Sequence, residues 1–201
     1  MHISDGVLSP AILIAGWGIT FPAVTFSVKR LHTDTIGVYG VIAAAFFAGS
    51  TIHIPIGPFS MHLLLTGIAG LLLGWGALMI ITVGLFLQAL FFGYGGLVVL
   101  GVNISIMAMP GAIMGTMGRR WIRNASEKKR PWIGAVVGSV TIVISATLLF
   151  AALSTTHPGF VTLGKLVFLG HIPVAIIEGF IGYWLIHFLQ KVKPELIGIS
   201  S

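Results

Sequence analysis

Long apolar runs, separated by short polar segments, occupy most of this chain. A helix that spans a bilayer needs about 20 predominantly apolar residues. Seven segments are candidates, some of them short: Ala11–Val28, Ile36–Ile52, Met61–Leu73, Trp75–Phe92, Leu97–Gly118, Trp132–Leu153 and Lys165–Gln190. Charged residues make up only 8% of the chain, against about 25% in soluble domains. We therefore predict an all-α, polytopic integral membrane protein that forms a single domain over residues 1–201.

The distribution of Lys and Arg indicates the number of crossings. The third segment is too short to span alone, so it is either a tilted short helix or a re-entrant segment. Loops on the cytoplasmic side are enriched in Lys and Arg. If all seven segments cross and the N-terminus is outside, only Lys165 of the 11 basic residues lies outside. We therefore predict seven transmembrane helices, the third of them short, with the N-terminus outside and the C-terminus cytoplasmic.

Several classes of function lack support in the sequence. The chain has no Cys, so thiolate metal sites and disulfides are excluded. The net charge of +6 is explained by the inner loops rather than by nucleic-acid binding. The run Gly159–Lys165 has the spacing of a phosphate-binding loop, but Leu166 stands where Ser or Thr would hold Mg²⁺. No nucleophile–base or acid pair is evident. We predict a protein that is not an enzyme and has no ATPase site of its own.

The first two residues, Met1-His2, form a potential metal chelator. The amino group of Met1, the backbone nitrogen of His2 and the His2 imidazole can reach one ion and close two small rings. Flat four-nitrogen sites are typical of Cu(II) and Ni(II). A histidine at position 2 of a frayed terminus is the competing interpretation. The bulk of His2 favours retention of Met1, and residues 3–10 do not resemble a secretory signal.

Such a chelate leaves one position open for a fourth ligand, and imidazole is the commonest metal ligand. His62 begins an apolar run after a tight Gly57-Pro58 turn on the predicted external side. It could equally be a histidine that is hydrogen-bonded inside the bundle. Given the incomplete chelate, we select His62 as the fourth ligand and His53 as the runner-up. Further candidates for support of the site or for the metal's path are Asp5, Asn103, His171 and Glu178.

The second apolar segment carries small residues four positions apart, Gly40, Ala44 and Ala48. Such stripes allow helices to approach closely. The stripe predicts either a contact within this chain or a docking face for another membrane subunit.

Several motifs together resemble those of the CbiM/NikM family of substrate-capture (S) components of energy-coupling-factor transporters for cobalt and nickel. They are Met1-His2-Ile3, Asp5-Gly6, Leu8-Ser9-Pro10, the run Pro58–Leu65, and Gly170-His171-Ile172-Pro173 with Glu178-Gly179. The resemblance covers essentially the whole chain, and it is closest to nickel-type members. Ser4 stands where many relatives have Pro, which does not affect a ligand.

The resemblance implies a multi-pass protein of the prokaryotic plasma membrane that imports Ni(II) or Co(II) as its substrate. It implies a metal site at Met1, His2 and His62. The expected partners are a transmembrane coupling subunit, two ATPase subunits and, in many cases, a small accessory membrane subunit, in addition to membrane lipid.

Two alternatives belong to other classes. A self-sufficient channel or secondary transporter would need ionisable residues that continue through the bundle. Apart from Glu178, the mid-membrane polar residues are neutral, such as Gln88 and Asn103, which disfavours it. An intramembrane enzyme would need the catalytic pair that is missing.

Overall fold

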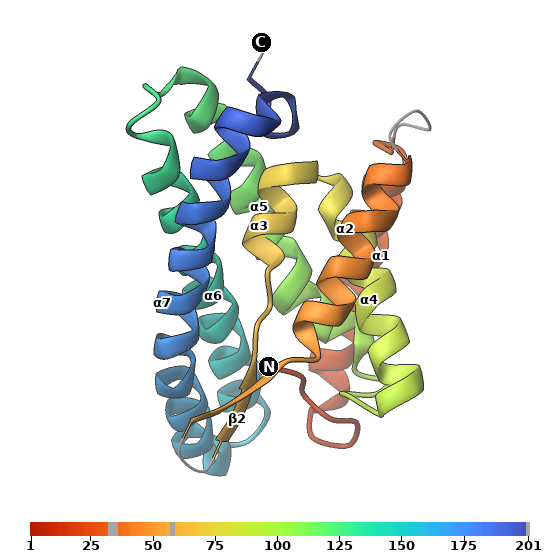
Figure 1. The fold of residues 1–201 in the computed structure, drawn as a ribbon. Helices are drawn as coiled ribbons and strands as arrows, with labels where there is room; N and C mark the ends of the chain where they lie inside the picture. Colours follow the sequence, from red (N-terminus) through yellow and green to blue (C-terminus); the bar gives the residue numbers. More distant parts are fainter. Residues whose placement is uncertain (32–35, 57–58, 200–201) are drawn as a thin grey trace.

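Seven α-helices form one bundle in the part of the chain that the computed structural model describes, which is residues 1–31, 36–56 and 59–199 without the side chains of residues 53–61 (Figure 1). The helices are α1 Pro10–Val28, α2 Ile36–Ser50, α3 Thr66–Leu73, α4 Gly76–Phe92, α5 Leu100–Asn124, α6 Arg130–Thr156 and α7 Val161–Val192. Two 3₁₀ turns, η2 Pro158–Phe160 and η3 Pro194–Ile197, flank α7. The prediction of an all-α, multi-pass membrane protein is confirmed.

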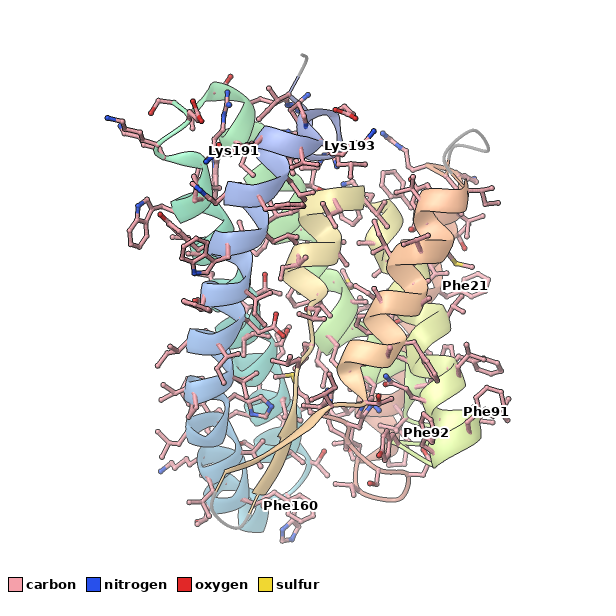
Figure 2. All side chains as sticks on the ribbon, viewed as in Figure 1. Phe21, Phe91, Phe92, Phe160, Lys191 and Lys193 are labelled. Atoms are coloured by element: carbon pink, nitrogen blue, oxygen red, sulfur yellow. The ribbon has the colours of Figure 1, made fainter. Side chains whose placement is uncertain are left out.

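Lengths and surfaces of the helices fit a lipid environment. Among the described residues, α1, α5, α6 and α7 (the last with η2) are long and apolar enough to cross a membrane, whereas α2 and α4 are shorter apolar helices. Large apolar side chains project outward from the bundle, among them Phe21 and Phe91, which are 73% and 66% exposed (Figure 2). In lipid such side chains face a solvent as apolar as themselves.

Most basic residues lie together at one end of the bundle, here called the basic end. Arg30, after α1, and Arg119, near the end of α5, line the same cleft together with Glu195. Lys191 and Lys193 lie at this end beside the C-terminus (Figure 2). Since four segments separate Arg30 from Arg119, this arrangement requires the short third segment to cross separately from α4, as the distribution of Lys and Arg predicted.

The third crossing, predicted over Met61–Leu73 as a tilted short helix or a re-entrant segment, is helical only in its second half. An antiparallel hairpin of β1 His53–Ile56 and β2 Phe59–His62 comes first, with His53 opposite His62 in the register. Residues 63–65 belong to neither strand nor helix, Leu65 has a left-handed φ of 54°, and α3 begins only at Thr66. The apolar sequence favours a helix here, so the extended half must be stabilised by the rest of the protein.

Close backbone packing fixes the depth at which α3 begins. A Cβ on Gly70 would lie 1.9 Å from the carbonyl oxygen of Gly111, and one on Gly115 would lie 2.0 Å from the carbonyl carbon of Gly70. Only glycine permits this contact between α3 and α5. The contact holds the N-terminus of α3 inside the bundle.

Three helices extend past the predicted ends of their apolar segments. α5 continues through Arg119 to Asn124, α6 begins at Arg130, and α7 begins at Val161. Long basic side chains cover apolar surface while their charges reach water, so a helix continues beyond the hydrocarbon layer. Hydropathy alone therefore underestimates these helices.

Candidate metal centre

The N-terminal segment folds into the bundle, and Figure 1 shows the N-terminus within its outline. Met1 and Ile3 are only 8% and 4% exposed and belong to the main apolar core, together with Leu8. Burial of apolar side chains stabilises this placement by roughly 25 cal/mol per Å². The segment is therefore an integral part of the fold.

Met1 and His62 meet inside the bundle. The amino nitrogen of Met1 lies 3.2 Å from Nε2 of His62, although 61 positions separate the two residues. His62 is 3% exposed, and its Nδ1 lies 3.1 Å from the carbonyl oxygen of Leu63. Because a carbonyl oxygen only accepts, Nδ1 of a neutral imidazole carries the proton and Nε2 presents its lone pair to the amine. A hydrogen bond of this kind commonly orients a metal-binding histidine.

The ring of His2 completes the group of nitrogen atoms. It stacks on His62 with the ring centroids 5.0 Å apart, and it lies 5.8 Å from the ring of Tyr94. Two imidazoles, one amino group and the backbone nitrogen of His2 are therefore close together.

Burial changes the protonation of the Met1 amine. Removal from water disfavours its charged form and lowers the pKa of the amino group from 8.0 to about 5. The amine is therefore neutral at pH 7, and its lone pair is available to a cation.

Asn103 of α5 fixes the position of this segment. Its Oδ1 accepts a hydrogen bond from the backbone N–H of Ile3, and its Nδ2 donates to the carbonyl oxygen of Ile3, both at 3.0 Å. Asn103 is 1% exposed, so this amide satisfies two backbone groups that are cut off from water. From the sequence alone, Asn103 is a candidate for support of the site or for the metal's path.

Asp5 joins the segment to the start of α5. Its carboxylate accepts hydrogen bonds from the backbone N–H groups of Val99 at 2.8 Å and Val98 at 3.4 Å. The N-terminus of a helix carries a partial positive charge and unpaired N–H groups, which favour an anion. The Asp5 backbone N–H also donates to the carbonyl oxygen of Gly95 at 2.9 Å.

Two glycines between α4 and α5 leave room for the segment, and sequence reasoning did not identify them. Gly95 has a φ of 82°, and a Cβ there would lie 2.6 Å from Nδ2 of Asn103. Gly96 has a φ of 138°, and its Cβ would lie 2.2 Å from the Asp5 carboxylate. The adjacent Gly-Gly pair after an apolar segment was the available signal, since positive φ favours glycine.

Glu178 of α7 holds the chain that follows His62. Its Oε1 accepts hydrogen bonds from the backbone N–H of Leu64 at 2.5 Å and of Leu65 at 2.6 Å. Glu178 is fully buried. It thereby stabilises the extended half of the third crossing and fixes the position of His62 beside Met1.

The remaining candidates have different positions. His171 of α7 lines a cavity together with Met1 and His2. The backbone of His53 pairs with that of His62, but the His53 side chain lies outside the described part of the chain. The small residues Gly40, Ala44 and Ala48 are all exposed on α2, and a Cβ on Gly40 would meet nothing within 4 Å. The stripe therefore faces away from the described part of the chain and makes no close intramolecular helix contact there.

The nitrogen atoms suit a flat metal complex better than a site of side chains alone. Among the described residues, no three His, Asp or Glu side chains gather as a metal site. In a square-planar complex with metal–nitrogen bonds of about 2.0 Å, adjacent nitrogens are about 2.8 Å apart. The 3.2 Å between the Met1 amine and His62 Nε2 is close to that value. His62 therefore lies next to the amine, where the sequence predicts the fourth ligand.

Comparisons with known proteins agree with a role in metal transport. The chain is 35% identical to a Haemophilus influenzae protein named for metal transport, covering 98% of this chain and 97% of that one. It is 30% identical to the cobalt transport protein CbiM of Sorangium cellulosum, over 98% of this chain and 94% of the relative. Against a crystal structure titled as a transition metal transporter, the TM-score is 0.81 at 25% identity, covering 96% of this chain and 93% of the other.

The model of one family, described as the cobalt uptake substrate-specific transmembrane region, matches residues 2–196. A fused nickel transport protein, NikMN of Rhodobacter capsulatus, is also 30% identical over 98% of this chain, which spans 64% of that longer relative. The chain therefore belongs to the CbiM family and is a multi-pass membrane component of cobalt and nickel transport.

Proposed function

We propose that this protein captures Ni(II), with Co(II) as the alternative substrate, at the face opposite the basic end. The ligands are the Met1 amine, the backbone nitrogen and imidazole of His2, and Nε2 of His62. The contact between the Met1 amine and His62 Nε2 carries the proposal. A neutral amine, a correctly oriented imidazole and an adjacent backbone nitrogen supply four nitrogen donors, which Ni(II) accepts in a plane.

The proposed direction of transport is inward. The basic end is cytoplasmic by the distribution of Lys and Arg, and His62 lies in the half of the third crossing that precedes α3. The metal therefore meets the protein from outside. Names of relatives include both cobalt and nickel transport, and the four-nitrogen set favours Ni(II).

Energy for import comes from partners in this proposal. They are a transmembrane coupling subunit, two ATPase subunits and an accessory membrane subunit, which the resemblance to energy-coupling-factor S components implies. Recovery of an ATPase pair with the tagged protein from native membranes tests this assembly. Purification without any ATPase from actively importing cells would instead favour a self-sufficient transporter.

An N-terminal extension tests the chelate. One Gly placed before Met1 moves the free amine away from the backbone nitrogen of His2 and from His62, so Ni(II) binding should be lost while helical content is retained. Calorimetry and circular dichroism are the measurements, with one Gly added after Ser201 as the matched control. Unchanged binding by a variant whose extension is verified by mass spectrometry would show that the amine is not a ligand.

Separate replacement of His62 and of His53 by Ala tests which histidine is the fourth ligand. His62→Ala should remove the visible absorption band of square-planar Ni(II), because the plane loses one nitrogen. His53→Ala should keep the band, with affinity reduced at most modestly. The reverse pattern would assign the ligand to His53.

A further inference from the structure

A cavity with a volume of about 300 Å³ lies beside the proposed metal ligands. Met1, His2 and Ser4 line it from the N-terminal segment, and Leu149 of α6 with Val167 and His171 of α7 line the facing wall. Ser4 and Leu163 are exposed residues of its lining, so the cavity reaches the outer surface of the bundle. It therefore joins a buried site to the exterior.

Hydrogen bonds hold the N-terminal segment to α5 and to the residues before it. Asp5 bonds the backbone of Val98 and Val99, and its own N–H bonds Gly95. Asn103 holds both backbone groups of Ile3. An ion that approached past these groups would have to break several of these bonds, whereas the cavity is open space beside Met1 and His2.

Among the described residues that line the cavity, His171 is the one histidine besides His2. It is 2% exposed, and its Nδ1 lies 2.7 Å from the carbonyl oxygen of Val167. A carbonyl oxygen only accepts, so Nδ1 of the neutral ring carries the proton and Nε2 carries the lone pair. The ring has the tautomer that can bind a cation through Nε2.

We propose that this cavity is the entrance for the metal ion and that His171 is a transient ligand on the way to the site. The proposal rests on the proposed function, since it needs a Met1-His2-His62 site. A Ni(II) ion exchanges its water ligands one at a time. A single imidazole at the cavity wall keeps the ion near the N-terminal segment while the amine and backbone nitrogen of the chelate bind.

This role has a specific kinetic consequence. A ligand that binds the ion only in transit stabilises the barrier between free and bound states, which entry and exit share. Its removal slows association and dissociation by the same factor and leaves the dissociation constant unchanged, because that constant is the ratio of the two rates. A resting ligand behaves differently, since its loss raises the dissociation constant, mostly through faster dissociation.

Stopped-flow absorbance on the purified full chain tests this inference. The association rate comes from mixing with NiSO₄, and the dissociation rate from a chase with excess chelator. His171→Asn keeps an N–H donor for the Val167 carbonyl but has no group at the position of Nε2. Both rates should fall about tenfold, with the dissociation constant unchanged.

Two controls separate loss of the His171 imidazole from general effects of a substitution on the external side of the bundle. Val143→Ala shortens an exposed apolar side chain of α6 that does not line the cavity, and His157→Ala removes an exposed histidine that does not line it either; both should keep wild-type rates. His171→Leu, which likewise has no nitrogen or oxygen at the position of Nε2, serves as the second variant if His171→Asn does not fold.

Two results would overturn the inference. Wild-type rates in the His171 variants would show that the ion does not pass this side chain. A weaker dissociation constant with faster dissociation would make His171 part of the resting site. Failure of the wild-type protein to bind Ni(II) is a separate result that rejects the proposed function itself.

Discussion

Asn103 is the residue on which the position of the N-terminal segment most directly depends. Asn103→Leu preserves the approximate shape but leaves the backbone N–H and carbonyl of Ile3 buried without partners, and each such group costs about 1–3 kcal/mol. We expect Ni(II) affinity to fall about 10- to 100-fold, as for other residues that support metal ligands. Calorimetry is the measurement. Asn124→Leu, an exposed change at the end of the same helix, should have no effect; equal losses in both would point to general damage to α5.

The buried amine of Met1 predicts how many protons metal binding releases. Its pKa is lowered to about 5, so between about pH 5 and 8 the docked amine holds fewer protons than an exposed amine. Docking of the segment is therefore favoured as pH rises through this window and is lost as pH falls toward 5.

At pH 7 the protein should release about one proton fewer per Ni(II) than the free peptide Met-His-Ile, whose amine is mostly protonated. Titration calorimetry in two buffers of different ionisation enthalpy counts these protons. Equal proton release by protein and peptide would mean that the amine is not buried as in the structure.

At the scale of elements, the broken third crossing depends on Glu178. Glu178→Leu removes the acceptor for two backbone N–H groups, and each N–H that is left buried without a partner costs about 1–3 kcal/mol. We expect His62 to shift and the square-planar Ni(II) band to be lost or strongly weakened. Glu178→Gln keeps an accepting oxygen and should retain most of the affinity. If the Gln variant loses binding as completely as the Leu variant, the carboxylate contributes more than an acceptor.

The exposed face of α2 predicts a role in assembly. Gly40, Ala44 and Ala48 all face away from the described part of the chain, so Ala44→Leu should leave folding and Ni(II) binding unchanged. Overpacking of a close helix contact typically costs about 1–3 kcal/mol, so co-purification with the coupling subunit and metal uptake should both decrease. Val41→Leu, another exposed change on α2, is the control. Normal uptake by Ala44→Leu would exclude a tight contact at this face.

At the scale of the whole molecule, the prediction concerns orientation in the membrane. The chain has no Cys, so a single introduced Cys is the one thiol of this chain that a reagent can label. Thr155 is exposed near the end of α6 that lies opposite the basic end. Ser126 is exposed in the turn between α5 and α6, at the basic end. A membrane-impermeant thiol reagent should label Thr155→Cys in intact cells and Ser126→Cys only after permeabilisation. The opposite labelling would place the metal site on the cytoplasmic side and contradict capture from outside.

Much of the fold could be predicted from sequence because lipid imposes a strong local rule. Each backbone polar group in a membrane must be satisfied within its own segment or by other protein groups, so long apolar runs become helices. The helix count and the common side of Arg30 and Arg119 followed from this rule and from charge. The Met1-His2 chelate could also be predicted from local information, because its proposed donors are adjacent in the chain. The choice of His62 needed a further inference, and the structure places this side chain against Met1.

Tertiary structure alone decided the features that depend on groups far apart in sequence. The apolar run Leu63–Leu65 favours a helix locally, yet it is not helical because Glu178, more than a hundred positions away, accepts the N–H groups of Leu64 and Leu65. The docking of Met1 likewise depends on Asn103, on the hydrogen bond between Asp5 and the start of α5, and on the absence of side chains at Gly95 and Gly96. The sequence by itself determined the helices and the adjacency of the Met1 amine to the His2 nitrogens, since both depend on neighbouring residues. Only the fold decided where a helix could be interrupted and the amine buried, because distant parts of the chain supply those hydrogen bonds.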